Sequence, residues 1–222
     1  MLYLVSTPIG NLGDFSFRGV ECLKCADLIL CEDTRRSVKL LSHYCIKNRL
    51  ESFNEHNEKR KLPFVIGMLK GGKNICLISD CGTPCISDPG FILVREAVKN
   101  NIQISVIPGA SAAVSALIAS GLPMEKFTFL GFLPKKMSHV EKLLISLKDR
   151  SETIIVYESP YRIMKTLDAF SRILPDSNIA LAREMTKKFE EFIYGKPNEI
   201  VQKIGNRVLK GEFAIVFSCR NP

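Results

Sequence analysis

Short apolar runs alternate with amphipathic stretches through the first half of the chain, and this alternation constrains the fold more than any other feature. The apolar runs, rich in Val, Ile and Leu, are residues 2–6, 27–31, 74–79 and 103–107. The stretches with helical periodicity are residues 17–25, 36–43, 58–69 and 92–99. Continuous apolar strands separated by helices are typical of a parallel sheet covered on both faces. We therefore predict an α/β fold whose N-terminal sheet is mostly parallel and flanked by helices.

The pattern changes after Gly121-Leu122-Pro123. Candidate strands follow at residues 127–133, 153–159, 178–182, 190–195 and 212–218, with helical patterns at 140–148 and 161–173. Several of these strands are separated by only a few residues, which requires some antiparallel pairing. The sequence therefore predicts a second α/β unit with a mixed sheet, and we place the two domains at residues 1–114 and 115–222.

Composition indicates a globular protein that needs no covalent support. A chain of 222 residues with 46% hydrophobic residues can bury a core without disulfides or metal. Eight cysteines are too few for a disulfide scaffold, and the first ten residues lack the basic segment of a secretory signal. The longest uncharged stretch, residues 100–124, is interrupted by Pro108-Gly109 and is too weakly apolar for a membrane span. These features predict a cytoplasmic protein with reduced thiols and no membrane contact.

Positive charge is concentrated in one part of the sequence. The whole chain has a net charge of +8, and residues 34–73 alone carry +7, whereas residues 1–33 carry −3. A basic block of this kind attracts polyanions and releases their counterions. It is also compatible with a solvated lysine-rich surface, so charge alone leaves nucleic-acid binding open.

Loops that could bind a ligand follow the predicted strands of the first half. They are residues 6–12, 31–35, 79–84 and 108–111. Ligands of open α/β sheets bind beyond the carboxyl ends of the strands, so four such loops predict a shared crevice, although each loop alone is compatible with a plain turn. Neither GxGxxG nor GxxxxGK[ST] is present, so the chain lacks the Rossmann fingerprint and the P-loop.

The cysteines and histidines do not indicate a metal site. Cys22 and Cys25 form a lone CxxC pair, which is more often a packed pair of small side chains than half of a zinc site. No histidine shows the spacing of a metal ligand. His56 differs from the others because it lies in the polar cluster of residues 54–58, which is either a functional loop or a solvated helix start.

Motifs along nearly the whole chain resemble those of the small-subunit ribosomal RNA methyltransferase I family, in the tetrapyrrole-methylase-like class. In order, they are TPIGNLGDFSFRGVECLKCADLILCEDTRRSVKLL, NEHNE, LISDCGTPCISDPGFILVREA, VIPGASAAVSALIASGLP, GFLPKK, VYESPYRI, REMTKKFEEFIYG and KGEFAIV. The resemblance implies a two-domain tetrapyrrole-methylase-like fold with S-adenosyl-L-methionine bound in the cleft between the domains. It also implies 2′-O-methylation of a decoding-centre cytidine in 16S ribosomal RNA, and commonly a homodimer. Family members often continue into a small helical extension after the last motif, and they commonly carry other small side chains at the cysteines of residues 79–85.

The resemblance also implies which residues hold the cofactor. They are Pro8, Cys81, Gly82, Thr83, Ile86, Ser111, Ala112, Tyr157, Glu158 and Met185. Much of this contact is expected to be made by the backbone. We add Asp80, because a carboxylate at this turn could pair with the ammonium of the methionine portion.

The transfer itself requires alignment of the 2′-oxygen and, for further rate, a base that removes its proton. Asp33 or His56 is the predicted base, with Glu55 and then Lys187 as the next candidates, and Arg35 is predicted to hold a phosphate. The residues predicted to bind RNA are Arg35, Arg36, Lys59, Arg60 and Lys61. No metal ion is required for this reaction.

Two alternatives to this function remain open. The first is methylation of a small substrate such as a tetrapyrrole, although those enzymes typically carry GxGPGD and GGDP where TPIGN and SDCGTP stand here. The second is a non-catalytic RNA-binding or ribosome-assembly protein, which explains the charge but not the four adapted loops. Binding of S-adenosylmethionine distinguishes the second alternative from the enzymes.

Overall fold

The computed structural model describes residues 1–219 and divides into two compact units, Met1–Ser111 and the chain from Ala112 onward. The sequence placed this boundary slightly later, between residues 114 and 115. No helix in the described part of the chain is both long and apolar enough to cross a membrane.

The first unit is built on a five-stranded sheet with the strand order β3-β2-β4-β1-β5. Every neighbouring pair in this sheet is parallel, as the continuous apolar runs predicted. The strands are β1 (Leu2–Val5), β2 (Leu28–Cys31), β3 (Leu50–Ser52), β4 (Ile75–Ile78) and β5 (Ile104–Ile107). All residues of β2 and β4 are buried, which is why these segments contain no polar alternation.

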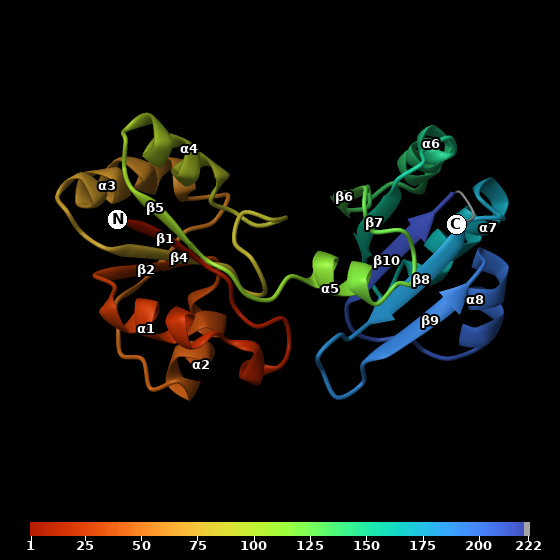
Figure 1. Cartoon of the computed structure of the whole chain (residues 1–222), viewed down its shortest axis with the longest axis horizontal. Helices are drawn as coiled ribbons and strands as arrows, with labels where there is room; N and C mark the ends of the chain where they lie inside the picture. Colours follow the sequence, from red (N-terminus) through yellow and green to blue (C-terminus); the bar gives the residue numbers. More distant parts are fainter. Residues whose placement is uncertain (220–222) are drawn as a thin grey trace. The chain divides into compact units, whose positions relative to one another are not determined.

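Helices cover both faces of this sheet (Figure 1). They are α1 (Phe17–Cys25), α2 (Thr34–His43), α3 (Glu58–Lys70) and α4 (Phe91–Lys99), together with the short 3-10 helix η1 (Leu12–Asp14). One core lies between the sheet and α1 and α2, where Leu23 and Leu41 are buried, and the other lies between the sheet and α3 and α4, where Val65 and Leu93 are buried. Asp33 is the last residue of the loop after β2 and the N-cap of α2. Its side chain accepts a hydrogen bond from the N–H of Arg35.

The second unit contains a mixed five-stranded sheet with the order β6-β7-β10-β8-β9. Its strands are β6 (Phe127–Phe132), β7 (Thr153–Glu158), β8 (Asn178–Arg183), β9 (Glu191–Gly195) and β10 (Phe213–Ser218). β6 and β7 are parallel, and the other three neighbouring pairs are antiparallel. The predicted mixed sheet is therefore confirmed.

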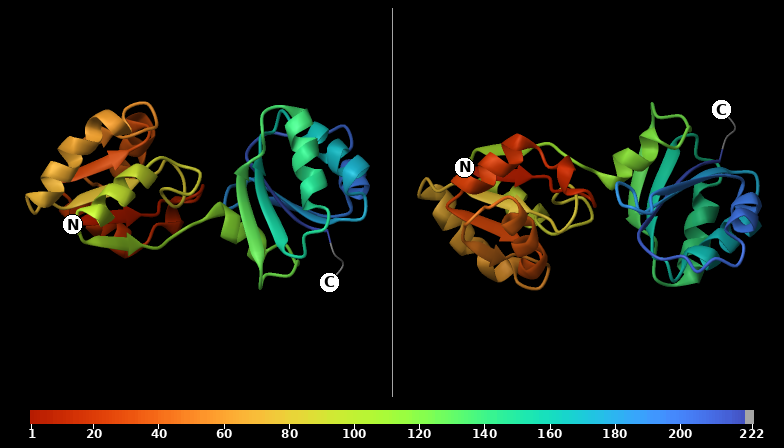
Figure 2. Two further views of the ribbon diagram at one scale, coloured as in Figure 1. Left: turned by 90° about the horizontal axis from the view of Figure 1, so that it is seen from above. Right: turned by 90° about the horizontal axis from the view of Figure 1, so that it is seen from below.

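Two of the helices in the second unit were not predicted from the sequence. The helices are α5 (Ala112–Ile118), α6 (Met137–Leu147), α7 (Ile163–Ile173) and α8 (Pro197–Ile204). Figure 2 shows α5 on one side of the sheet and the other three on the opposite side, where Phe170 and Ile200 are buried. α5 lacks a charged face, so its periodicity is weak, whereas Pro197 at the first position of α8 was an available signal of a helix start.

Candidate functional site

Three strand-end loops of the first unit converge on the hydroxyl of Thr83. This hydroxyl donates a hydrogen bond to the carbonyl of Ala110 at 3.1 Å and lies 3.1 Å from the hydroxyl of Ser6. The three residues follow β4, β5 and β1, which are neighbours in the sheet. Because the strands are parallel, their carboxyl ends meet at one edge, and these hydrogen bonds join the loops there.

The turn after β4 fits closely against the loop after β1. The N–H of Thr7 donates to the carbonyl of Gly82 at 2.8 Å, and the N–H of Gly82 donates back to the carbonyl of Thr7 at 3.2 Å. Gly82 has a φ of +85°, and a Cβ atom there would lie 3.3 Å from Cγ2 of Ile9. This turn therefore requires glycine both for its left-handed backbone and for the close approach of Ile9.

The loops after β2 and β3 border an open hollow of about 440 Å³. Its lining is strongly polar and consists of Glu32, Asp33, Thr34, Arg35, Ser52, Asn54, Glu55 and His56. Four of these were predicted from the sequence as candidates for catalysis, namely Asp33, Arg35, Glu55 and His56. The structure brings them together because β2 and β3 are neighbouring parallel strands, so the polar clusters that follow them share one edge.

The Asp33 carboxylate is already engaged within the protein. It accepts hydrogen bonds from Nε and Nη2 of Arg35 at 3.1 and 2.9 Å and from the backbone N–H of Arg35 at 2.9 Å. The hydrogen bonds from the Arg35 side chain, followed by the one from its backbone, lower the pKa of Asp33 to about 2. A carboxylate of such low basicity is a weak proton acceptor near neutral pH.

Two further carboxyl groups of the first unit, Glu32 and Asp88, were not singled out as site residues from the sequence. Burial and then the charge of Asp80 raise the pKa of Glu32, which lines the hollow. Burial, followed by the charge of Glu32, raises the pKa of Asp88 to about 7, although a hydrogen bond from Ser79 opposes this shift. A carboxyl group with a raised pKa in a hollow, as for Glu32, is typical of a functional site. Their burial is a tertiary property, so the sequence did not distinguish them from other acidic residues.

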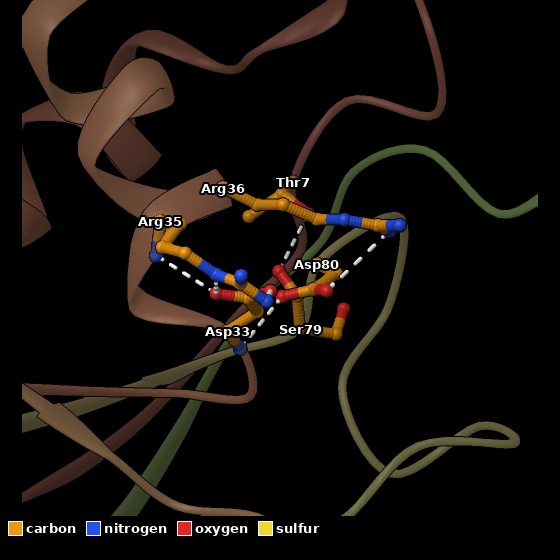
Figure 3. A network of polar contacts seen from close by, with 6 residues as sticks. All are labelled: Thr7, Asp33, Arg35, Arg36, Ser79 and Asp80. Carbon is orange, nitrogen blue, oxygen red and sulfur yellow. Dashed lines mark hydrogen bonds and ion pairs between the residues drawn. The ribbon is translucent and has the colours of Figure 1, made fainter.

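Asp80 lies between the turn after β4 and the loop after β2. Its Oδ1 accepts a hydrogen bond from the backbone N–H of Asp33 at 3.0 Å, and its Oδ2 pairs with Nη1 of Arg36 at 3.4 Å (Figure 3). The Asp80 side chain is only 13% exposed. The residue predicted to pair with a cofactor ammonium therefore already binds two groups of the protein.

The basic residues at the start of α3 fall into two groups. Lys59 and Arg60 are exposed, as RNA-binding residues must be. The ammonium of Lys61 instead pairs with Glu51 and donates to the carbonyl and hydroxyl oxygens of Ser52 at 2.7 and 3.1 Å. Its charge is neutralised inside the unit, which the sequence could not indicate because the partners lie on β3.

The other predicted cofactor residues of the first unit lie in the same strand-end loops. Pro8 is buried in the loop after β1, whereas Cys81 and Ile86 are exposed in the turn after β4. Ser111 ends the first unit, and Ala112 begins α5 in the second. Ser111 and Ala112 are both partly exposed, so their backbone and side chains are accessible.

Besides Ala112, the second unit contains three predicted cofactor residues, which separate into two sets. Tyr157 and Met185 pack at the border of the core on the α5 side of the sheet. Glu158 faces the opposite side, because successive side chains of a strand alternate. Its buried carboxylate accepts hydrogen bonds from the N–H of Ser159 at 2.8 Å and the hydroxyl of Thr166 at 2.7 Å. Only the backbone of Glu158 is therefore available to a ligand on the Tyr157 side.

Lys187 and the cysteine pair contribute little to a site. The Lys187 ammonium pairs with Glu184 at 2.9 Å and with Glu212 at 2.8 Å. Cys22 points toward the core, where its sulfur lies 3.5 Å from that of Cys76. Within residues 1–219 no group of three or more His, Cys, Asp and Glu side chains is arranged to hold a metal ion.

Comparison with known proteins identifies relatives along nearly the entire chain. Residues 1–201 match the family model described as tetrapyrrole (corrin/porphyrin) methylases. The chain is 47% identical to ribosomal RNA small subunit methyltransferase I of Halalkalibacterium halodurans, over 97% of this chain and 74% of that protein. It is 46% identical to the protein of the same name from Bacillus subtilis, over 100% of this chain and 76% of that one. For the same protein of Thermotoga maritima the identity is 43%, over 98% and 97% of the two chains.

Solved structures show the same fold at low sequence identity. Diphthine synthase superposes with a TM-score of 0.76 at 14% identity, over 98% of this chain and 89% of that one. Uroporphyrin-III-C-methyltransferase of Thermus thermophilus superposes with a TM-score of 0.64 at 18% identity, over 97% and 93% of the two chains. Together with the match to the family model, these superpositions confirm the predicted α/β fold of the tetrapyrrole-methylase class.

We predict that Asp88 makes stability depend on pH. Its pKa of about 7 lies above that of a free aspartate, so between about pH 4 and pH 7 unfolding releases a proton that the folded protein keeps. The free energy of unfolding should therefore fall as the pH rises through this window. Asp88→Asn should flatten that fall, as measured by urea denaturation at several pH values.

A second variant tests the cause of the shift. Glu32→Gln removes the like charge and should lower the pKa of Asp88, observed by carboxyl-carbon NMR titration. An unchanged pH dependence of stability in Asp88→Asn would contradict the prediction.

Proposed function

We propose a function from the premise that this chain belongs to the tetrapyrrole (corrin/porphyrin) methylases and, within them, to the ribosomal RNA small subunit methyltransferase I family. The proposed function is that the protein transfers a methyl group from S-adenosylmethionine to RNA of the small ribosomal subunit. The observation that carries this proposal is 43–47% identity to family members over at least 97% of the chain. We further propose, from the motif resemblance, that the acceptor is the ribose 2′-oxygen of a decoding-centre cytidine in 16S RNA.

The loops around Thr83 fit a cofactor that is held mainly by backbone atoms. The turn from Ser79 to Thr83 is held in place by the pairing of Gly82 with Thr7. Within it Cys81 is exposed and Thr83 is partly exposed, whereas Gly82 is buried. When bound, S-adenosylmethionine supplies an activated methyl group on a positively charged sulfur. We propose that this turn holds the methionine portion, together with Pro8, Ile86, Ser111 and Ala112.

The second unit offers an apolar surface for the adenosyl portion. Tyr157 and Met185 border the same core cluster and are only partly buried, whereas Glu158 can contribute through its backbone alone. An aromatic ring and a thioether are suitable contacts for a purine. We propose these two side chains as the adenosyl contacts.

The hollow beside β2 and β3 is proposed to take the acceptor nucleotide. A volume of about 440 Å³ is within the usual range for small-molecule sites, and the lining supplies both hydrogen-bond donors and acceptors. Sequence-specific RNA recognition commonly uses unstacked nucleotides whose edges are read by polar side chains. Arg35, whose side chain is 88% exposed while Asp33 orients it, is well placed to contact a phosphate.

The acceptor hydroxyl must lose its proton during the transfer. Asp33 is weakened for this role by its pKa of about 2, whereas His56 and Glu55 are exposed at the hollow. Imidazole is the most frequent general base in enzymes. We therefore propose His56 as the base and Asp33 as the residue that positions Arg35.

Competing functions are distinguished by their ligands. The small-molecule methyltransferases share the fold at 14–18% identity, which supports the architecture but not their substrates. A non-catalytic RNA-binding protein would not bind S-adenosylmethionine in a calorimetric titration. Cytoplasmic location and homodimerisation stay predictions.

Deletion of the gene should remove one 2′-O-methyl group from 16S RNA, and the intact gene should restore it. A gene carrying Thr83→Arg should fail to restore it, because a long cation replaces a hydroxyl that holds three loops together and blocks the cofactor turn. Ser151→Arg, on an exposed loop of the second unit, is the matched control and should restore the methyl group. The measurement is mapping of 2′-O-methyl groups in RNA from the four strains.

Unchanged 16S methylation after deletion would refute the proposed function. Normal binding of S-adenosylmethionine by purified Thr83→Arg protein, with normal melting, would refute only the location of the cofactor.

His56→Gln should slow methyl transfer by about 10²–10⁴-fold, since removal of a general base typically costs that much. Asp33→Asn should slow it less, because the carboxylate that it replaces is a poor base. Single-turnover rates with saturating cofactor and RNA measure this step. A near-normal rate for His56→Gln would contradict the assignment and turn attention to Glu55 and Glu32, and then to Lys187.

Lys59→Ala and Arg60→Ala should each weaken RNA binding regardless of sequence. Each removed phosphate contact should reduce the slope of log K against log salt by about 0.7–0.9. Lys70→Ala, which removes an exposed charge at the other end of α3, is the control and should leave the slope unchanged. Slopes for Lys59→Ala and Arg60→Ala equal to that of the unaltered protein would mean that this end of α3 is only a solvated surface.

A further inference from the structure

The strand order of the first sheet places Asp80 between the two proposed ligand sites. The order is β3-β2-β4-β1-β5, so the hollow lies at the β3 and β2 ends and the cofactor turn lies at the β4, β1 and β5 ends. Asp80 follows β4 by two residues and therefore stands where the two groups of loops meet. It lies in the same turn that pairs with the β1 loop through Gly82.

The contacts of Asp80 cross from one site to the other. One carboxylate oxygen accepts the backbone N–H of Asp33, and the other pairs with the guanidinium of Arg36. Both partners lie in the loop and the first turn that follow β2. A single side chain from the cofactor turn thus holds the backbone of the loop that lines the hollow.

This contact continues into the hollow through Asp33. The Asp33 backbone is bonded to Asp80, and the Asp33 side chain binds both the backbone N–H and the guanidinium of Arg35. Figure 3 shows this series of contacts from Asp80 to Asp33 and from Asp33 to Arg35, with the separate contact between Thr7 and Ser79 beside it. A displacement of the cofactor turn would therefore move the group proposed to hold the RNA phosphate.

The Asp80 carboxylate is poorly placed to serve the cofactor directly. Its side chain is 13% exposed, and each of its oxygens already has a partner in the β2 loop. A direct contact with an ammonium would have to compete with both partners. The same geometry suits a residue that acts indirectly, by holding Asp33 and Arg36 in place.

We infer that Asp80 is a positioning residue that couples the cofactor turn to the nucleotide hollow, so that occupation of one site strengthens binding at the other. The inference rests on the proposed function, because it takes these two places as the cofactor and RNA sites. Coupling between sites is reciprocal, so each ligand should raise the affinity for the other by the same factor.

The experiment measures the coupling factor directly. S-adenosylhomocysteine, which cannot donate a methyl group, is titrated with and without small ribosomal subunits from cells that lack the gene, and the reverse titration is performed. We expect saturating S-adenosylhomocysteine to raise the affinity for the subunit by about 5- to 150-fold in the unaltered protein, the usual range of such coupling.

Three substitutions separate the two contacts of Asp80. Asp80→Ala removes both, and should reduce the coupling to within about twofold while the affinity for each ligand alone stays within about threefold. Asp80→Asn keeps an oxygen for the N–H of Asp33 but loses the charge that pairs with Arg36, so its coupling should be intermediate. Arg36→Gln removes the same ion pair from the other side and should match Asp80→Asn.

Glu96→Gln is the matched control, since it removes a carboxylate that pairs with Lys99 at 2.8 Å on α4 of the same unit. Its coupling should equal that of the unaltered protein. General destabilisation would lower the melting temperature and weaken the binding of both ligands. A loss of coupling in Asp80→Ala with normal melting and normal affinity for each ligand alone therefore has another cause.

Three results would overturn the inference. They are undiminished coupling in Asp80→Ala, an absence of coupling in the unaltered protein, and a tenfold or greater loss of S-adenosylhomocysteine affinity in Asp80→Asn, which would make Asp80 a direct cofactor ligand. Failure of the unaltered protein to bind either ligand would instead refute the proposed function.

Discussion

The parallel ladders that join β2, β4 and β1 are the interaction on which the rest of the first unit depends. β2 and β4 are fully buried, so their backbone N–H and C=O groups have no water and must pair with neighbouring strands. Parallel pairing brings the carboxyl ends of the strands to one edge. Loops from distant parts of the sequence are therefore neighbours there, and the candidate residues of the first unit lie in these loops or beside them.

This edge places several carboxyl groups in environments that differ sharply. Asp33 is stabilised as an anion by the guanidinium and backbone of Arg35, whereas Asp88 is partly buried near Glu32. The pKa values that result, about 2 and about 7, separate one carboxylate that orients a cation from one that carries a proton near neutral pH. Because both residues are aspartates, the difference between their pKa values comes from their environments and not from the residue type.

The sequence predicted four strands and the four α-helices of the first unit because these elements have clear periodicity, whereas β3 is only three residues long and has no such pattern. Asp33 and His56 were both candidates for the base, but their common location depends on the pairing of β2 with β3. The burial of Asp88 and the ion pair between Lys61 and Glu51 depend on packing between elements, so no local pattern revealed them. The inward direction of Glu158 follows from strand alternation, but only once the register of β7 is known.

The two proposed ligands make opposite electrostatic demands on this edge. A sulfonium cofactor is attracted by carboxylates, whereas RNA phosphates are repelled by them and attracted by cations. The structure reconciles these demands by pairing: Arg35 neutralises Asp33, and Arg36 neutralises Asp80. In both pairs the arginine side chain is the more exposed partner, with 88% and 68% exposure against 28% and 13% for the aspartates. An approaching phosphate thus meets guanidinium groups first, while the carboxylates behind them fix the direction in which those groups point.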